Sequence, residues 1–414
     1  MSVTWPIWLT WVLMGLLPLW GLVLLKYLVD IRQVPVSYNY RSLIVRWKTT
    51  LMTALGFTLV VFGLVLMLAF ISGITAVCRQ SGEPENVIVL SKGAADEVLS
   101  NLPRDTISAL EHIRDEKGLP GSRILASREM FLNANRFNPR TQDYTALQLR
   151  GVQPIVFQVH TAIRVIKGRA LRAGQSEVMI GRSVETGQNL HVGDTFEMGR
   201  KRWRVCGVFD AQGSALESEV WCDLSELASQ FKREGSYSTV VLRTPSAASA
   251  QRIAESLASN RQMNVEAYTE PQYYAKQAEQ MQTLQLAAWV IAWFMGTGAV
   301  FGVMTTMFAA IGQRIKDIAV MRIMGFQARA ILFSFLIEAA LISLVGGVLG
   351  SGLGYLINGF TQNANVGSRT VEFSFQVDIW IMVSCLVFSI AMGIVGGLLP
   401  ALSAMRIKPL EALR

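Results

Sequence analysis

The clearest pattern in the chain is a set of long apolar segments that carry almost no charge. Each has at least about 20 residues, enough for one helix to cross a hydrocarbon core of about 30 Å. Only the fourth segment contains an acidic residue, Glu338. The pattern therefore predicts about five transmembrane helices. They lie at residues 5–25, 51–77, 284–310, 331–356 and 379–402.

A long polar segment separates the second and third apolar segments. Its first part alternates strand-like and helix-like patterns, starting with NVIVLS at residues 86–91, and this alternation is typical of an α/β layer. At about residues 164–223 strand-like patterns predominate and predict a β-rich subdomain inserted into the α/β one. The expected fold class is an α-helical membrane protein with an α+β extracytoplasmic domain between its second and third transmembrane helices.

One helix is expected to be much longer than a membrane span. Pro271 suits the first turn of a helix, and the next proline is Pro400. An unbroken helix from Pro271 to Ile311 would be about 60 Å long, roughly twice the hydrocarbon thickness. Half of it would then stand outside the membrane as a stalk. A stiff stalk can carry force between the two ends of the helix.

The segment QRIKDIAVMRIMGF, residues 313–326, follows the third apolar segment. Its apolar residues recur at helical spacing and predict a short amphipathic helix, which Gly325 is suited to end. The pattern alone leaves two interpretations open. The helix is either a docking surface for a partner or an interfacial helix that only caps two spans. The residues of the predicted apolar face are Ile315, Ile318, Ala319 and Ile323.

Charge predicts the orientation of the chain in the membrane. The chain is 51% hydrophobic and only 16% charged, with a formal net charge of +8. The excess of Lys and Arg lies between the first two spans, between the third and fourth, and after the fifth. Such segments stay on the cytoplasmic side, so the N-terminus and the large domain are expected outside and the C-terminus inside. The basic balance thus indicates membrane topology and does not indicate a nucleic-acid surface.

These patterns divide the chain into consecutive parts. The first helix lacks the positive flank and cleavage site of a signal peptide, so we expect an uncleaved span; an interfacial helix anchored by tryptophans is the alternative. The expected parts are a transmembrane helix at 1–30, a cytoplasmic segment at 31–50, a second span at 51–78, the extracytoplasmic domain at 79–283, and three spans with a cytoplasmic helix at 313–326 and a cytoplasmic tail at 284–414.

Two kinds of side chain stand out as candidates for special roles. Glu338 is costly to bury as a charge within a span, so it is a functional candidate, with a hydrogen-bonded structural acid as the favoured alternative. Cys206 and Cys222 lie in strand-like segments of an exported domain, where oxidation is permitted. A cross-strand disulfide is one interpretation, and two buried thiols is the other.

The chain lacks the motifs of a catalytic subunit. Its three histidines are far apart, and neither HExxH nor GxSxG occurs. A G-x-x-x-x-G-K-[ST] motif, which would cradle nucleotide phosphates, is also absent from the sequence. We therefore expect no catalytic, cofactor-binding or metal-binding residues. If ATP drives the protein, a second polypeptide must bind the ATP and Mg.

Several motifs resemble one family. RIKDIAVMRIMGF resembles the segment between the second and third conserved spans of MacB/FtsX-type (type VII) ABC transporter permeases. FLIEAALISLVGGVLGSGLGYLI is similar to their third span, and GGLLPALSAMRIKPLEALR to their ending. IKGRALRAGQSEVMIG, VGDTFEMG and RVCGVF look like the β-rich part of the MacB-type periplasmic core domain. The resemblance covers residues 39–414 in order, and because the family usually has four spans, the helix at 5–25 is extra.

The resemblance implies a non-catalytic permease of the inner membrane, either a homodimer or a pseudo-dimer. Its cytoplasmic helix would contact a separate ATPase dimer and drive export or extraction of a hydrophobic, lipid-linked or peptide-like cargo, with an extracytoplasmic adaptor or cargo protein as a further partner. An FtsX-like regulator that activates an extracytoplasmic enzyme without moving cargo is the alternative. The residues expected to contact the ATPase are Arg314, Asp317, Ile318, Met321, Arg322, Gly325 and Phe326.

Overall fold

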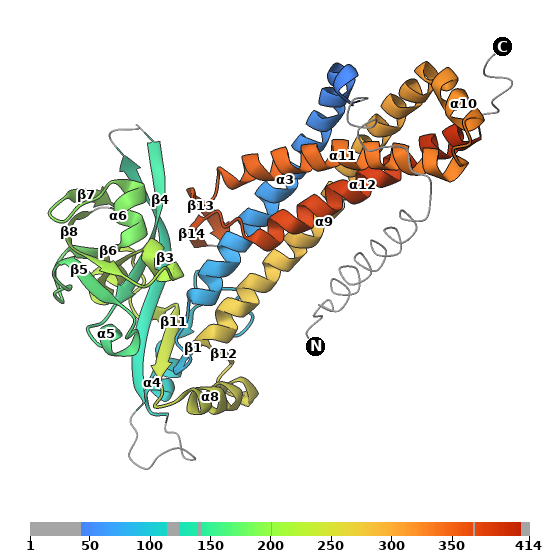
Figure 1. Ribbon diagram of the computed structural model, residues 1–414. Coiled ribbons are helices and arrows are strands. Elements are labelled where there is room, and N and C mark those ends of the chain that lie inside the picture. The colour runs from blue at the N-terminus through green and yellow to red at the C-terminus, as the bar shows by residue number, and fades with distance from the viewer. Residues whose placement is uncertain (1–42, 114–123, 139–142, 200, 367–368, 407–414) are drawn as a thin grey trace. The chain divides into compact units, whose positions relative to one another are not determined.

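The computed structural model describes residues 43–113, 124–138, 143–199, 201–366 and 369–406, which form two compact units (Figure 1). The helical unit contains the described residues up to Leu68, Ala287–Ile357 and those from Val377 onward. The α/β domain contains Ala69–Leu286 and Asn358–Gln376. The predicted first span at 1–30, most of the segment at 31–50 and the end of the tail lie outside the described residues.

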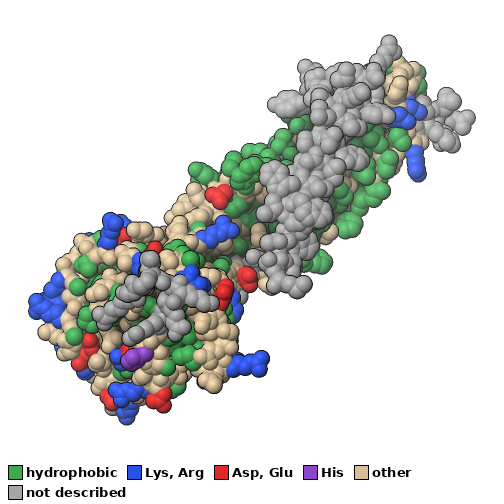
Figure 2. Space-filling model, turned by 90° about the horizontal axis from the view of Figure 1, so that it is seen from below, with side chains coloured by type: hydrophobic (Ala, Val, Ile, Leu, Met, Phe, Trp, Pro, Cys, Tyr) green, Lys and Arg blue, Asp and Glu red, His purple; other side chains and the backbone are tan. Residues whose placement is uncertain are grey.

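The described residues contain four helices long and apolar enough to cross a membrane. Four of the expected spans are therefore present, and Figure 2 shows hydrophobic side chains over much of the coloured surface of the helical unit. The second of these helices has 44 residues without a break, about 66 Å at 1.5 Å per residue. The four helices are α3 (Trp47–Gln80), α9 (Glu270–Gln313), α11 (Ala328–Tyr355) and α12 (Ile379–Met405).

Small residues allow these helices to pack closely. A side chain at Gly346 of α11 would collide with Phe57 of α3, because the two helices meet there without intervening atoms. On another side, α11 contacts α12, where Ser389 Oγ donates a 2.8 Å hydrogen bond to Ser343 O. The ring of Phe388 on α12 lies 5.9 Å from that of Trp289 on α9. These contacts join α3, α11, α12 and α9 into one bundle.

A ten-stranded sheet forms the centre of the α/β domain. Its strands run in the order β12-β1-β11-β3-β4-β9-β6-β8-β5, and β7 pairs with both β3 and β8. The strands are β1 (Asn86–Ser91), β3 (Leu125–Asn138), β4 (Asp143–Val152), β5 (Arg164–Gly168), β6 (Glu177–Gly181), β7 (Thr195–Met198), β8 (Lys201–Asp210), β9 (Glu219–Asp223), β11 (Thr239–Arg243) and β12 (Val265–Thr269). A separate pair of short strands is β2 (Leu102–Pro103) and β10 (Ser236–Tyr237).

Helices cover one end of this sheet. Apolar residues of α4 and α8, among them Ile107 and Ile253, join Val87 of β1 and Leu242 of β11 in one buried cluster. Alternation of helix and strand along the sequence thus produces the expected α/β layer. The helices of the domain are α4 (Arg104–Glu111), α5 (Val156–Val159), α6 (Arg182–Gln188), α7 (Leu224–Gln230) and α8 (Ala247–Ser259), with one 3-10 turn at Ala215–Ser218.

The β-rich part at 164–223 is continuous with the same sheet. Strands β3, β4, β9, β6, β8 and β7 form a closed ring, because β7 returns to β3 at the pair Arg136 and Met198. The interior of the ring is apolar, with Leu149 and Trp203 fully buried. The long strands β3 and β4 belong to both the α/β layer and the ring, so the two predicted subdomains share one sheet.

The cysteines in this sheet are not bonded. Cys206 and Cys222 are both free and buried. Strand β6 lies between β8, which carries Cys206, and β9, which carries Cys222. The two side chains also pack into different clusters, Cys206 with Phe209 and Cys222 with Trp203. The disulfide interpretation is therefore wrong, and the alternative of two buried thiols is what the structure shows.

A hairpin between α11 and α12 belongs to the α/β domain. Its strands are β13 (Thr361–Val366) and β14 (Arg369–Ser374). Glu372 N donates a 3.0 Å hydrogen bond to Ser218 Oγ, and the ring of Phe373 lies 5.1 Å from that of Phe70. This hairpin was not predicted, because its polar residues resemble an ordinary loop between two spans.

Candidate functional site

The helix after the second conserved span is α10 (Ile315–Ile323), and only Arg314 separates it from α9. Gly325 has φ of +92° directly after the helix. Phe326 N donates to Met321 O at 3.1 Å and Gly325 N to Arg322 O at 3.2 Å, which is the Schellman arrangement that ends helices. A residue with a β-carbon is strained at this φ, so glycine is suited to the position. The expected role of Gly325 in ending the helix is observed.

The apolar residues of α10 do not form the single face that was predicted. Ile318 and Ala319 are fully buried, but 38% of Ile315 and 60% of Ile323 are exposed in this chain. Val320 and Met324 are exposed as well. The helix therefore has a buried anchor and a separate exposed surface. We call Val320, Ile323 and Met324 the outer apolar surface of α10.

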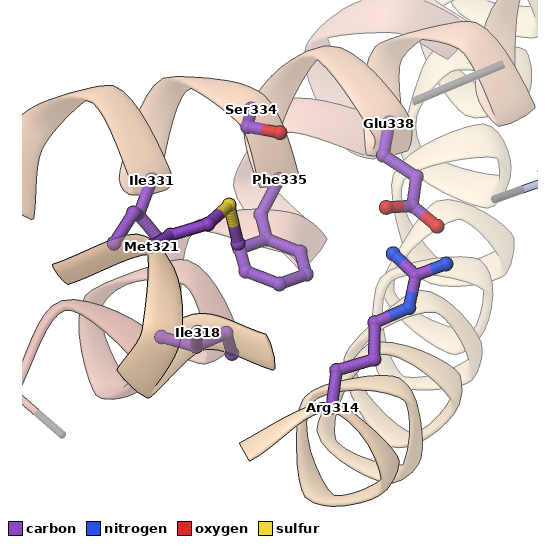
Figure 3. Close-up of a pocket in the computed structure, with 7 residues that line it drawn as sticks. All are labelled: Arg314, Ile318, Met321, Ile331, Ser334, Phe335 and Glu338. Carbon is purple, nitrogen blue, oxygen red and sulfur yellow. The ribbon is translucent and has the colours of Figure 1, made fainter. Parts of the chain in front are cut away.

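A small cavity lies where α10 packs on α11 (Figure 3). Ile318 and Met321 from α10 face Ile331 and Phe335 from α11. At one side of the cavity the Arg314 guanidinium and the Glu338 carboxylate point toward one another. Glu338 is 6% exposed, so its charge needs a polar neighbour at this depth. The arrangement holds the junction of α9 and α10 against α11.

The structure divides the residues expected to contact an ATPase into two groups. Arg314, Ile318 and Met321 line the cavity together with Glu338. Asp317 and Gly325 are exposed, while Arg322 and Phe326 are partly buried. Ile318 was expected to touch a partner, but it is fully buried in its own chain and packs inward. The outer apolar surface of α10 was missed, because periodicity alone does not tell which side of a short helix faces its own bundle.

A second cluster of charges is buried inside the α/β domain. Arg150 on β4 is 1% exposed, and all five of its N–H groups donate to carboxylates. Two of these hydrogen bonds reach Glu219 on β9, at 2.6 and 2.7 Å. The others reach Glu97 and, at 2.5 Å, Glu129 on β3. Arg150 therefore ties together three segments that are distant in sequence.

The cluster continues to the first residue of α9. His160 Nε2 lies 3.2 Å from Glu129 Oε1, and His160 Nδ1 lies 3.6 Å from Glu270 Oε1. The other oxygen of Glu270 accepts hydrogen bonds from Asn86 Nδ2 at 3.1 Å and Glu83 N at 2.8 Å. We call Glu97, Glu129, Arg150, His160, Glu219 and Glu270 the buried charge network. It connects the interior of the sheet with the start of the long helix.

Burial and charge act in opposite directions on these groups. Burial alone would raise the pKa of Glu129, but Arg150 and His160 outweigh it and lower that pKa to about 2. Burial would lower the pKa of His160, but Glu129 and Glu270 raise it to about 9. His160 is therefore protonated at neutral pH. Neutral donors such as Trp221 Nε1, 2.9 Å from Glu219 Oε2, complete the network.

The network has little signature in the sequence. Arg150 follows ALQL in a strand, and Glu129 precedes MFL, so each is one charge beside apolar residues. A charge in such a position usually points to solvent, and its burial depends on partners that only the fold brings near. His160 likewise has no local motif around it and is one of three histidines scattered along the chain.

Comparison with known families decides the affiliation of the chain. A model of the MacB-like periplasmic core domain matches residues 50–260, and a model of the FtsX-like permease C-terminal region matches residues 289–409. The chain belongs to the MacB/FtsX family of ABC transporter permeases. The resemblance found in the sequence motifs is thereby confirmed. The expected fold class, membrane helices with a MacB-like α/β domain after the first conserved span, is confirmed as well.

Relatives of this MacB/FtsX-type permease include proteins of different lengths. It is 23% identical over 399 residues to the uncharacterized ABC transporter permease YknZ of Bacillus subtilis (strain 168), covering 90% of this chain and 96% of YknZ. It is 26% identical over 386 residues to the macrolide export ATP-binding/permease protein MacB of Hahella chejuensis, covering 84% of this chain and 57% of that protein. To the uncharacterized permease YvrN of B. subtilis it is 36% identical over 113 residues, 27% of this chain and 26% of YvrN.

The chain thus spans less than two thirds of the length of YvrN and of the Hahella protein. Among solved structures, the periplasmic region of MacB from Actinobacillus actinomycetemcomitans is similar, with a TM-score of 0.35 and 14% identity, covering 46% of this chain and 91% of that one. The extracellular domain of YknZ gives a TM-score of 0.32 and 19% identity, covering 44% of this chain and 99% of that one.

Proposed function

We propose that this permease transmits the closure of a separate ATPase dimer to its α/β domain and so exports or extracts a hydrophobic, lipid-linked or peptide-like cargo. The observation that supports this most directly is the continuity of α9. The helix starts at Glu270 in the buried charge network and runs to Gln313, one residue before α10. One element therefore joins the interior of the α/β domain to the candidate docking helix.

Force can pass through this element only if both of its ends are held. At its start, Glu270 has three neighbours in the domain, His160, Asn86 and Glu83. At its other end, Arg314 faces Glu338 of α11, and Ile318 anchors α10 in the bundle. A buried anchor resists rotation of α10 about its own axis. A push on α10 is then passed to α9 and α11 together.

The outer apolar surface of α10 is the surface we assign to the ATPase. Val320, Ile323 and Met324 are 44%, 60% and 61% exposed, next to the exposed charges of Lys316 and Asp317. An apolar patch with a charged rim is typical of a protein–protein contact. In this proposal the Lys- and Arg-rich segments, α10 included, lie in the cytoplasm and the α/β domain lies outside, in agreement with the distribution of positive charge.

The proposal predicts two separable defects. Met324→Glu places a negative charge on the docking surface. The ATPase should therefore copurify with the wild-type chain but not with this variant. In Leu284→Pro the ATPase should still bind and hydrolyse ATP, but ATP should no longer change the conformation of the α/β domain. Proline in a helix interior removes a hydrogen bond and costs about 3 kcal/mol or more, which breaks the continuity of α9. Pull-down, ATPase rate and the ATP-dependent protease sensitivity of the domain are the measurements.

Matched controls exist for both variants. Leu99→Glu is the control for Met324→Glu, because Leu99 is 65% exposed and lies in the α/β domain, away from α10. Leu284→Ala is the control for Leu284→Pro, because alanine keeps α9 helical. Binding of the ATPase to Met324→Glu at the wild-type level would refute the docking surface. An unchanged response to ATP in Leu284→Pro would refute transmission through α9.

A further inference from the structure

An open groove lies in the helical unit, between the start of α3 and the end of α9. Its volume is about 520 Å³. One wall carries Arg46, Trp47 and Lys48, and the other carries Thr305 and Ala309 of α9. The groove is separate from the cavity between α10 and α11, because no lining residue is shared between the two.

The groove is positively charged. Arg46 and Lys48 line it, and none of the lining residues that the structure describes is Asp or Glu. The first turn of α3 also contains no acidic residue, and the N-terminus of a helix carries partial positive charge. Arg46 is held in place by a 2.9 Å hydrogen bond from its Nη2 to Ala310 O. Lys48 is exposed, with its Nζ 5.8 Å from the centre of the Trp47 ring.

The polar side chains of this groove are the two cations, the exposed amide of Gln313 and three threonine hydroxyls. The hydroxyl of Thr305 donates to Phe301 O and Gly302 O of its own helix, and that of Thr49 donates to Arg46 O. These hydroxyl protons are therefore engaged by the backbone. The groove therefore offers two cations, while its hydroxyl protons are already engaged. This combination suits an anionic group such as a phosphate better than it suits a neutral sugar or amide.

An apolar stripe continues from the groove along each helix. On α9, Phe301 and Phe308 are 60% and 45% exposed and lie about one turn from Thr305. On α3, Met52 is 73% exposed. Trp47 at the helix end is also exposed, as is typical of tryptophans at the level of lipid headgroups. A bound anion at this position has apolar surface directly beside it on the membrane-spanning helices.

We propose that the groove binds the phosphate headgroup of an anionic glycerophospholipid, with the acyl chains along the stripe. Basic grooves between transmembrane helices are a known form of headgroup site. A second copy of the chain docked on the same groove by two-fold symmetry would bring the two pairs of cations together, which is unfavourable. The site does not depend on the proposed ATPase coupling, so the two proposals fail or succeed separately.

Native mass spectrometry of the purified full chain tests the site. Delipidated protein is titrated with dioleoylphosphatidylglycerol or with dioleoylphosphatidylcholine, which has the same chains but no net charge. We expect preferential binding of phosphatidylglycerol, and in Lys48→Gln about fivefold weaker binding, the factor that corresponds to one lysine at a membrane surface. Lys48→Arg should retain the preference, and Ala309→Phe, which fills the groove, should remove it.

Lys316→Gln is the matched control, because Lys316 is an exposed lysine of α10 that does not line the groove. Equal retention of the two lipids by the wild type would overturn the proposal. Equal effects of Lys48→Gln and Lys316→Gln would also overturn it, because binding would then reflect general surface charge. If 10 mM inorganic phosphate displaced the lipid from wild type, the site would be one for free phosphate and the assignment to a lipid would be wrong.

Discussion

His160 Nε2 lies 3.2 Å from Glu129 Oε1 in the interior of the α/β domain, and both side chains are at most 2% exposed. The same histidine approaches Glu270, the first residue of α9, through Nδ1 at 3.6 Å. A protonated imidazole between two carboxylates attracts both, and the low-dielectric interior strengthens this attraction. His160 thus links the core of the domain to the long helix, beside the hydrogen bonds of Asn86 and Glu83 to Glu270.

The stability of the α/β domain should fall at alkaline pH because of His160. Its pKa is raised from 6.5 to about 9, so folding favours the protonated form. The stabilisation is complete below about pH 6.5 and is lost as pH rises through about 9. Thermal unfolding of the full chain can be followed by tryptophan fluorescence. The unfolding midpoint at pH 9 should be a few degrees lower than at pH 6.5, because a loss of 1 kcal/mol lowers the midpoint by about 2–4 °C.

His160→Gln should remove most of this dependence and lower the midpoint at pH 6.5. His112→Gln is the control, because His112 is an exposed histidine of the same domain. A pH dependence that persists in His160→Gln would show that another group titrates in this range. Glu129, with a pKa of about 2, contributes stability above about pH 4.5 and loses it only as pH falls toward 2, outside the range tested.

Loss of the central cation should destabilise the domain strongly. Arg150→Met leaves the carboxylates of Glu97, Glu129 and Glu219 buried without their shared partner. Removing one member of a buried ion pair costs about 3–5 kcal/mol, whereas an exposed pair contributes about 0–1 kcal/mol. Urea unfolding should give a lower midpoint for Arg150→Met than for Arg202→Met. The Arg202 side chain is 71% exposed and pairs with Glu197. Equal midpoints for the two variants would contradict a stabilising network.

Arg314 and Glu338 should behave as a coupled pair. Arg314→Glu places two acids beside the cavity, and Glu338→Arg places two cations there, so each should lower the thermal midpoint of the full chain in detergent. The double variant restores opposite charges and should recover part of the loss, a coupling of about 0.5–3 kcal/mol. The matched double variant at exposed Lys316 and Asp317 should show weak coupling. Additive losses at Arg314 and Glu338 would mean that the two side chains act independently.

The cysteines of the sheet should remain reduced in the folded protein. Burial raises the pKa of the Cys206 thiol to about 11, and it raises that of Cys222 further. A thiol with a raised pKa is a poor nucleophile at neutral pH. Dithiothreitol should leave the unfolding midpoint of wild type unchanged, and a maleimide should label both thiols only after denaturation. A lower midpoint in reductant would indicate a disulfide that the structure does not contain.

The four described membrane helices could be predicted from the sequence, and the bounds of α10 could nearly be predicted as well. A span needs about 20 apolar residues whatever surrounds it, and Gly325 ends a helix through its own backbone freedom. The exposure of Ile323 and the burial of Ile318 were not predictable. Both are apolar and both fit the helical spacing, and only the packing of α11 decides which one faces the bundle.

Local patterns were sufficient to predict the four described spans, the family and the continuity of α9. Apolar length, short motifs and the lack of proline after Pro271 each act within one segment. The tertiary structure alone decided that Arg150 meets Glu97, Glu129 and Glu219, that Glu270 meets His160, and that β6 separates the two cysteines. Each of these relations joins segments far apart in sequence. Strand order and burial set them, and neither is encoded in a local pattern of residues.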